Sequence, residues 1–302
     1  MIKVNKIRTI IFGVLLLIAI TSNAQQDKLT AAYEFLQQNE IDSAKANIDI
    51  AVLHPETASD PQAWYVHGFI YKTIFMKNEK NNKQSPARIV ALNSFKKANS
   101  LNPDKEDYLE NIENIKLLIG TLNNHASELL TPANYKIAIK LFNTFQEYNK
   151  LVDPSTQTFQ SNQIAFDLAL VAVFNSILEK AKTDSVKKQK FIALSKSIYN
   201  KVLKLDPENV SANYGMAILF YNQAVDLVLN TPLDEGLTTL NIMLDNSKEL
   251  SKASLPFMQK AYELDPSRTA TLEGLAGIYN ILHEEEKSME FRRKKAELEM
   301  NR

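Results

Sequence analysis

The chain has 302 residues, its 35 Lys and Arg balance its 35 Asp and Glu, and it contains no cysteine. A neutral chain without a block of basic residues argues against nucleic acid as the main partner, because phosphate binding needs clustered Lys and Arg. The lack of cysteine excludes a disulfide framework and thiolate chemistry. Stability must therefore come from the burial of apolar side chains, which a chain of this length can supply.

The first residues have the pattern of a cleavable signal peptide. Three basic residues within the first eight precede an apolar run over 10–20, and small residues at 22–24 precede the expected cleavage point. Eleven helical residues span roughly 16 Å, which is too short for a ~30 Å hydrocarbon core. A signal peptide over 1–24 is therefore favoured over an uncleaved anchor. We expect an exported protein, most simply in the periplasm of a Gram-negative bacterium, without stable membrane insertion after cleavage; a secreted or membrane-associated protein is the alternative.

The remaining chain, 25–302, has the pattern of an all-α protein. Only seven glycines occur in the full chain of 302 residues, and apolar residues recur at three- and four-residue steps. A capping residue precedes proline at four places that each predict a helix start, namely Asp60-Pro61, Ser85-Pro86, Thr131-Pro132 and Thr231-Pro232. Pro256 falls within a helical pattern and predicts a kink or a helix start. Together these features predict antiparallel helix pairs, over 26–38 with 41–53, 61–78 with 86–100, 105–129 with 133–151, 158–182 with 185–204, 209–230 with 233–264, and 268–282 with 284–300.

Five further prolines follow the predicted helix ends at a recurring interval. They are Pro55, Pro103, Pro154, Pro207 and Pro266, at spacings of 48, 51, 53 and 59 residues. A recurring period of this kind predicts a repeat array. The second predicted pair carries a polar insertion around 76–85, which we expect to form a surface loop.

The residues inside the pairs resemble the tetratricopeptide repeat. The second pair reads W-x2-H-G-x2-Y from Trp64 and then A-x3-F from Ala91, against W-x2-L-G-x2-Y and A-x3-F in the family, so His67 departs from the leucine. The resemblance implies a right-handed α-solenoid of about six antiparallel hairpins, in which a small residue lets two helices approach and large residues fill the space beside it. The packing positions implied in this way are Ala32, Trp64, Gly68, Tyr71, Ala91, Phe95, Ala98, Ala217, Phe220, Ala276 and Tyr279.

The resemblance is stronger in some parts of the chain than in others. It is good over 61–103 and 195–300, fair over 28–55 and weak over 105–182, where long helices blur the register. We treat 25–302 as one helical repeat domain that can be divided into sub-blocks 25–104, 105–204 and 205–302.

The sequence shows no arrangement that a catalytic or metal site would need. None of the four histidines stands four residues from another, and no phosphate-binding loop or G-x-S-x-G motif occurs. The run from His283 to Glu286 fans outward at a helix start and cannot converge on a metal ion. We therefore expect no enzyme activity, no catalytic residue, no cofactor and no metal. An enzyme with a dispersed site is the least favoured alternative.

The resemblance implies a ligand surface on the inner face of the first helix of each pair. The matching positions are Tyr33, Tyr65, Phe69, Lys72, Tyr214, Ile218, Tyr221 and Asn222. An aromatic strip suits an extended peptide or a glycan, since tyrosine offers area and a polar tip; alternatively these rings pack against adjacent repeats. Chaperone-binding members of the family clamp a peptide terminus with Lys and Asn where Tyr65 and Phe69 stand here, which disfavours that function. We predict a scaffold for a protein or peptide partner, with binding of glycan or cell-wall fragments as the alternative.

Overall fold

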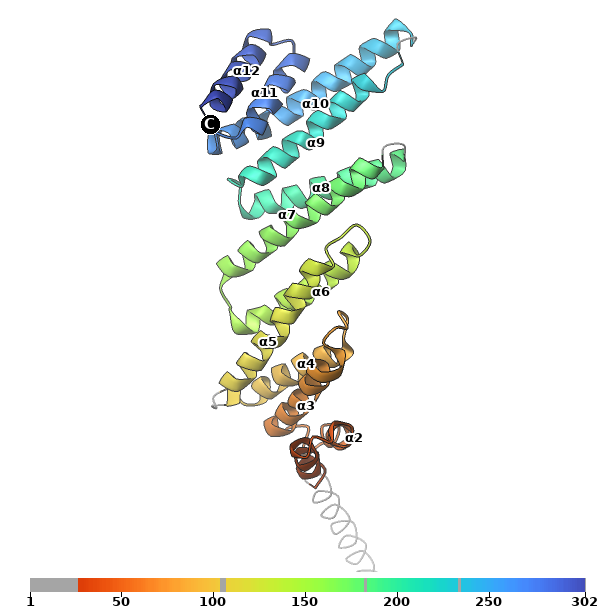
Figure 1. The fold of residues 1–302 in the computed structure, drawn as a ribbon, viewed down its shortest axis with the longest axis vertical. Helices are drawn as coiled ribbons and strands as arrows, with labels where there is room; N and C mark the ends of the chain where they lie inside the picture. The colour runs from red at the N-terminus through yellow and green to blue at the C-terminus, as the bar shows by residue number, and fades with distance from the viewer. Residues whose placement is uncertain (1–26, 104–106, 182–183, 233–234, 302) are drawn as a thin grey trace, which may run out of the picture. The chain divides into compact units, whose positions relative to one another are not determined.

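The computed structural model describes residues 27–103, 107–181, 184–232 and 235–301, and the predicted signal peptide lies outside them. All regular structure in the described residues is helical (Figure 1), which confirms the all-α prediction. The helix bounds lie within a few residues of the predicted ones. A helix over 27–37 is followed by α2 (Ile41–Ala51), α3 (Pro61–Ile74), the π-helix η1 (Phe75–Glu79), α4 (Pro86–Leu101), α5 (Asp107–Glu128), α6 (Tyr135–Val152), α7 (Thr156–Lys180), α8 (Ser185–Leu205), α9 (Val210–Leu229), α10 (Leu237–Leu264), α11 (Thr269–Ile281) and α12 (Glu285–Met300).

Two of the predicted cap–proline pairs start helices as expected. The carboxylate of Asp60 accepts from the backbone N–H of Gln62 at 2.9 Å, and the hydroxyl of Ser85 accepts from that of Arg88 at 3.1 Å. Each proline then occupies the first helical position, where its missing N–H costs nothing. Pro256 lies inside α10, which excludes a helix start there.

The two threonine–proline pairs do not start helices, so that prediction is wrong. α6 begins only at Tyr135 and α10 only at Leu237. The carbonyl of Thr131 accepts from the N–H of Tyr135 at 2.9 Å, which makes a turn before the helix. The hydroxyl of Thr231 donates to the carbonyl of Leu227, which belongs to the preceding helix. Each threonine therefore takes part in the turn or the helix end that precedes the next helix.

Three of the predicted small residues lie where paired helices cross closely. A methyl group at Gly68 would lie 2.8 Å from Phe95 Cε1, so α3 and α4 have no room for a side chain there. Ala217 of α9 is fully buried, and its carbonyl accepts from the hydroxyl of Ser254 in α10 at 2.8 Å. Ala276 of α11 accepts from α12 in the same way, also at 2.8 Å.

Large residues fill the space beside these crossings. Phe220 of α9 stacks on Phe257 of α10 with ring centroids 6.3 Å apart, and Tyr279 of α11 stacks on Phe291 of α12 at 5.7 Å. The indole of Trp64 packs in the core shared with α2 and donates to the carbonyl of Ala58 at 2.9 Å. Stacking at these distances is one of the two arrangements that aromatic pairs favour.

The polar insertion after α3 is more structured than a simple loop. Its first residues continue the helix as η1, and the hydroxyl of Ser85 donates to Glu79 at 2.6 Å. Arg88 is fully buried and donates to the carbonyl of Lys83 at 2.6 Å and to the hydroxyl of Thr121 at 3.1 Å. Burial lowers the pKa of Arg88 to about 10. The insertion is thus held by a buried cation that also reaches α5.

The chain divides into two compact units. The N-terminal unit comprises Met1–Leu129 and Lys136–Phe159, and the C-terminal unit comprises Leu130–Tyr135 and Gln160–Arg302. The three predicted sub-blocks and the right-handed superhelix stay predictions.

α7 is long and apolar enough to cross a membrane by length and composition, with a mean hydropathy of 1.3 over 18 residues. Its contacts are those of a core helix. The ring of Phe174 is buried and meets Phe191 of α8 with centroids 5.1 Å apart, and Val171 belongs to the same buried cluster as Met216 of α9. Apolar side chains of α7 therefore pack against α8 and α9 in the C-terminal unit.

Candidate functional site

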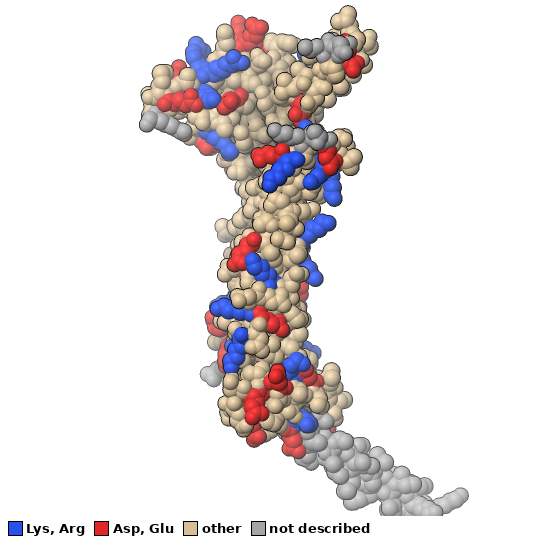
Figure 2. Space-filling model, turned by 45° about the vertical axis from the view of Figure 1, so that its right-hand side comes forward, with Lys and Arg blue, Asp and Glu red and all other residues tan. Residues whose placement is uncertain are grey.

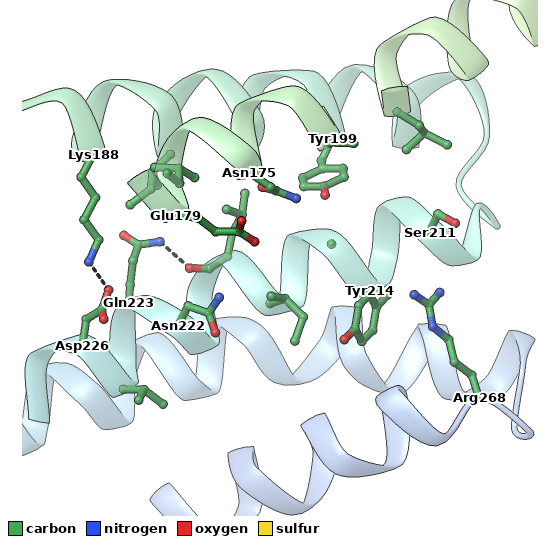
Figure 3. Close-up of a pocket in the computed structure, with 18 residues that line it drawn as sticks. Asn175, Glu179, Lys188, Tyr199, Ser211, Tyr214, Asn222, Gln223, Asp226 and Arg268 are labelled. Carbon is green, nitrogen blue, oxygen red and sulfur yellow. Dashed lines mark hydrogen bonds and ion pairs between the residues drawn. The ribbon is translucent and has the colours of Figure 1, made fainter. Parts of the chain in front are cut away.

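The predicted ligand residues are found in separate places. Tyr214, Ile218 and Asn222 of α9 line one open groove in the C-terminal unit (Figure 3). The other five, Tyr33, Tyr65, Phe69, Lys72 and Tyr221, do not line it.

The groove measures about 700 Å³ and is formed by α7, α8 and α9, with the start of α11 at one end. Aliphatic side chains line it throughout, namely Leu168, Ala172, Leu178, Ile192, Ile218, Leu219 and Val225. Polar groups project among them from every participating helix, namely Asn175, Glu179, Lys188, Tyr199, Ser211, Tyr214, Asn222, Gln223, Asp226 and Arg268. The volume and the mixture of apolar surface with a few polar groups are typical of ligand sites.

Tyr199 reaches the groove from α8 because α9 has a glycine opposite. A side chain at Gly215 would collide with the hydroxyl and ring of Tyr199. The Tyr199 hydroxyl is paired with the amide of Asn175, and burial raises the pKa of this tyrosine. Figure 3 shows Tyr199 and Asn175 side by side at the α7–α8 wall. A neutral phenol and an amide therefore offer hydrogen-bonding groups on that wall at any physiological pH.

The two ends of the groove differ in charge. At one end Lys188 of α8 forms an ion pair with Asp226 of α9, so its charge is compensated. At the other end the Arg268 guanidinium lies 4.0 Å from the centroid of the Tyr214 ring. None of the ion pairs among the described residues includes Arg268. The Arg268 end therefore carries a positive charge that pairs with no carboxylate in the described part of the chain.

Sequence reasoning missed the groove residues that come from outside the first helix of a pair. Tyr199 and Lys188 belong to α8, and Arg268 is the residue before α11. The family pattern places the ligand surface on the first helix of each pair. It therefore does not predict residues of a second helix, or of the turn before a helix, as ligand residues. The glycine at position 215, two residues before the expected small residue Ala217, was the available signal for a large neighbour.

Tyr221 packs between helices. This is the alternative to ligand binding, in which the aromatic rings pack against adjacent repeats. It belongs to the core cluster that α9 shares with α10 and α11, and a side chain at Gly277 of α11 would collide with its hydroxyl. Burial raises the pKa of Tyr221. Tyr33, on the helix over 27–37, is 49% exposed.

The predicted residues of α3 come together against α5 in the N-terminal unit. The hydroxyl of Tyr65 donates to Glu110, and Lys72 donates to the side-chain oxygen of Asn114 at 2.7 Å. The Lys72 ammonium also lies 4.0 Å from the centroid of the Phe69 ring. Burial lowers the pKa of Lys72, while Glu110 acts in the opposite direction. These side chains are thus engaged with one another across two helices; their use as ligand contacts stays a prediction.

A Ser–His–Asp contact occurs in the N-terminal unit but presents no exposed nucleophile. His67 Nδ1 lies 2.7 Å from the Ser94 hydroxyl, and Nε2 lies 3.3 Å from Asp49 Oδ1. Ser94 is 1% exposed, and its hydroxyl also lies 2.7 Å from the carbonyl of Val90, so it is buried and engaged. This arrangement links α2, α3 and α4 and is structural. No group of three metal-binding side chains comes together in the described residues.

The crossings at Gly68, Ala217 and Ala276, with their neighbouring large rings, repeat one packing scheme in successive hairpins. The fold is an all-α helical repeat whose crossings resemble those of tetratricopeptide hairpins. No protein-family model matches this chain, and no curated protein matches it.

Several solved structures are similar to this chain. PilW, described as a widely conserved type IV pilus biogenesis factor, is 15% identical over 90% of this chain and 91% of its own, with a TM-score of 0.29. MamA 41-end from Desulfovibrio magneticus RS-1 is 15% identical over 78% of this chain and 97% of its own, with a TM-score of 0.32. YrrB, described as a TPR protein with an unusual peptide-binding site, is 15% identical over 84% of this chain and 94% of its own, with a TM-score of 0.26. At these TM-scores the likeness carries no functional argument, and the fold assignment rests on the hairpins themselves.

Proposed function

We propose that the protein is an exported, non-catalytic scaffold whose C-terminal groove binds an extended segment of a partner protein. The observation that carries this proposal is the groove itself, in which hydrogen-bonding side chains from α7, α8, α9 and the start of α11 stand among aliphatic ones. An extended peptide has a free backbone N–H and C=O at every residue. Amides such as Asn175, Asn222 and Gln223 can serve both, because each amide donates and accepts.

The end near Arg268 suits a carboxylate on that peptide. A guanidinium is always charged and binds a carboxylate through two parallel N–H donors. Since no carboxylate among the described residues pairs with this guanidinium, an acidic side chain or chain terminus of the peptide would complete the site. The same contact covers one face of the Tyr214 ring, so a sugar cannot stack against that face. Peptide is therefore favoured over glycan as the ligand.

Peptide selection against the full chain tests this proposal. Extended peptides with and without an acidic residue are selected from a displayed library, and their affinities are measured by fluorescence anisotropy. We expect Tyr214→Ala and Asn222→Ala to weaken binding by at least about tenfold, or ~1.4 kcal/mol. Arg268→Gln should weaken acidic peptides and leave neutral ones unchanged. Asn124→Ala, at an exposed amide of α5, is the matched control.

Binding that none of the groove variants changes would contradict the proposal. Saturable binding of cell-wall glycan fragments that Tyr214→Ala abolishes would favour the glycan alternative instead.

Export is supported by the sequence of residues 1–24 alone. Cell fractionation followed by N-terminal sequencing tests it. We expect a chain that begins at Gln25 outside the cytoplasm, and a cytoplasmic chain that retains Met1 would overturn the export part of the proposal.

A further inference from the structure

The polar insertion over 76–85 is linked to α5 through two basic side chains. Lys83 of the insertion forms an ion pair with Glu128 of α5 at 2.7 Å. Arg88, in the first turn of α4, donates from Nη2 to the carbonyl of Lys83 at 2.6 Å and from Nη1 to His125 Nδ1 of α5 at 3.0 Å. The same Nη1 donates to the hydroxyl of Thr121 at 3.1 Å. Arg88 therefore joins the insertion to α5.

The position of the insertion against α5 depends on these two side chains. Most residues from 76 to 85 are exposed, and the turn is closed by the N–H of Ser85, which donates to the carbonyl of Asn82 at 3.0 Å. Lys77 donates to Asn39, which lies before α2 and not on α5. In the described part of the chain, the remaining hydrogen bonds of the insertion likewise stay within α3, η1 and α4.

His125 can accept the hydrogen bond from Arg88 only while its imidazole is neutral. A guanidinium carries donors and no acceptor, so Nδ1 must present its lone pair and the ring proton must lie on Nε2. A protonated imidazole carries a hydrogen on each nitrogen. Protonation of His125 would therefore place two donors and two positive charges against each other at this contact.

The charges around His125 do not relieve that repulsion. Arg88 from α4 and Lys83 from the insertion disfavour the imidazolium, Glu128 of α5 favours it, and with partial burial the balance lowers the pKa of His125. Arg88 stays charged, because burial lowers its pKa only to about 10. On the face of the N-terminal unit that Figure 2 shows, Lys and Arg mix with Asp and Glu. Local neighbours therefore set the protonation of His125.

We propose that acidification loosens the insertion from α5, with His125 as the group that takes up the proton. The imidazolium is repelled by Arg88 and turns toward solvent, which is open to it because His125 is only partly buried. Arg88 then loses an acceptor on α5, and the turn that it holds through the carbonyl of Lys83 is less firmly placed. The ion pair of Lys83 with Glu128 persists, since Lys83 lowers the pKa of Glu128, so the opening is local.

Proton linkage gives the direction of this response. In the opened form His125 has its ordinary pKa of about 6.5, and in the attached form the pKa lies below that value. The opened form therefore binds more protons, and its population rises as the pH falls through and below about 6.5. This response lies in the N-terminal unit and does not depend on the proposed peptide groove.

Hydrogen exchange of the full chain, followed by mass spectrometry at about pH 7.5 and about pH 5.5, tests the proposal. The readout is the opening equilibrium of the amides of Asn82, Ser85 and Arg88, after correction for intrinsic exchange rates. All three amides are hydrogen-bonded within the turn or the start of α4. We expect opening to increase at least about threefold at the lower pH. Amides of α9 serve as the internal reference and should not respond.

Three variants identify the titrating group. His125→Asn keeps an acceptor near the position of Nδ1 but cannot titrate, so its insertion should stay attached at both pH values. His125→Ala removes the acceptor and should raise opening at both. His67→Gln removes the other buried histidine of this unit and should keep the pH response of the parent chain. Circular dichroism establishes that each variant is folded.

Three results would overturn the proposal. One is an opening equilibrium of the insertion in the parent chain that does not change with pH. Another is a pH response that survives in His125→Asn, because a different group would then take up the proton. The third is a response that His67→Gln removes, because the change would then begin at the contact between α2, α3 and α4.

Discussion

Gly215 shows how an absent side chain shapes the groove. Because this position of α9 carries only hydrogen, the ring of Tyr199 from α8 lies directly against the helix backbone. Tyr199 in turn holds the amide of Asn175 at the groove wall. A polar wall is thus built from three residues on three helices, and any larger residue at 215 would displace it.

His67 stands where the tetratricopeptide pattern has leucine, and its surroundings are polar on one side. Asp49, Tyr71 and Lys45 face it from the α2–α3 side, and Ser94 from α4. Burial lowers the pKa of His67, and the nearby Asp49 opposes this without reversing it. The folded state therefore holds the imidazole neutral more firmly than the unfolded chain does.

Because of this lowered pKa, we expect the stability of the folded state to fall as the pH falls. Since the folded pKa lies below the unfolded value of about 6.5, the folded state binds fewer protons. The contribution of His67 is fully present above the unfolded pKa and is lost as pH falls from there toward the folded pKa. We expect the free energy of unfolding in urea to fall between about pH 7.5 and about pH 5.5, and to fall less in His67→Gln.

Part of the fall should survive in His67→Gln, because burial and Arg88 also lower the pKa of His125. An unchanged pH dependence in His67→Gln would show that His67 is not the titrating group.

At the scale of elements, one hydrogen bond recurs between the helices of a pair. A buried serine in the second helix donates to a carbonyl in the first, at Ser247 to Ala224, Ser254 to Ala217 and Ser288 to Ala276, with distances of 3.0, 2.8 and 2.8 Å. A serine at a close crossing fits because it is small and because its hydroxyl is satisfied by a neighbouring backbone. The bond accompanies the small residue that lets the helices approach.

Substitution of one of these serines tests the role of the bond. Ser254→Ala removes a fully buried hydroxyl that is hydrogen-bonded, and we expect a loss of about 0.5–1.5 kcal/mol in the free energy of unfolding. Ser251, one turn earlier in α10, is equally buried, but its hydroxyl has no hydrogen-bond partner in the described part of the chain. Ser251→Ala should therefore be neutral or stabilising, since it removes an unsatisfied polar group. Equal losses in the two variants, measured by urea unfolding, would show that the bond contributes nothing specific.

At the scale of the whole molecule, helices pack mainly against the next helices along the chain. The core of the last two hairpins illustrates this, because Ala217 of α9, Met258 of α10 and Leu275 of α11 form one buried cluster. Repeat arrays of this kind have a stability that is nearly a sum over neighbouring units. The last hairpin should accordingly stabilise its neighbour without being required for the rest to fold.

Deletion of residues 268–302 tests this additivity. The truncation exposes Met258 and Tyr221 to water, so we expect a lower unfolding midpoint. The helical circular dichroism signal per residue should nevertheless stay close to that of the parent chain. Complete loss of that signal would mean that folding is cooperative over the whole chain, and the repeat interpretation of its energetics would fail.

The sequence by itself determined the helices and most of their crossings. Helix starts such as Pro61 and Pro86 depend on local capping, and close crossings such as Gly68 need a small residue whatever the partner is. Capping and the need for a small residue each depend on only a few neighbouring residues of the chain. The residue types and their spacing in the sequence therefore reveal both. The prediction that the threonine–proline pairs start helices is wrong because a threonine can also form hydrogen bonds in the turn or helix end that precedes it.

Only the tertiary structure decided which aromatic residues face a ligand. Tyr214 and Tyr221 are seven residues apart, so they lie on almost the same face of α9, and helical periodicity cannot separate them. Tyr214 meets Arg268 at the end of the groove, while Tyr221 meets Gly277 in the seam with α11. Their surroundings are set by residues more than fifty positions away along the chain, and a contact of that separation exists only once α9 and α11 have packed together.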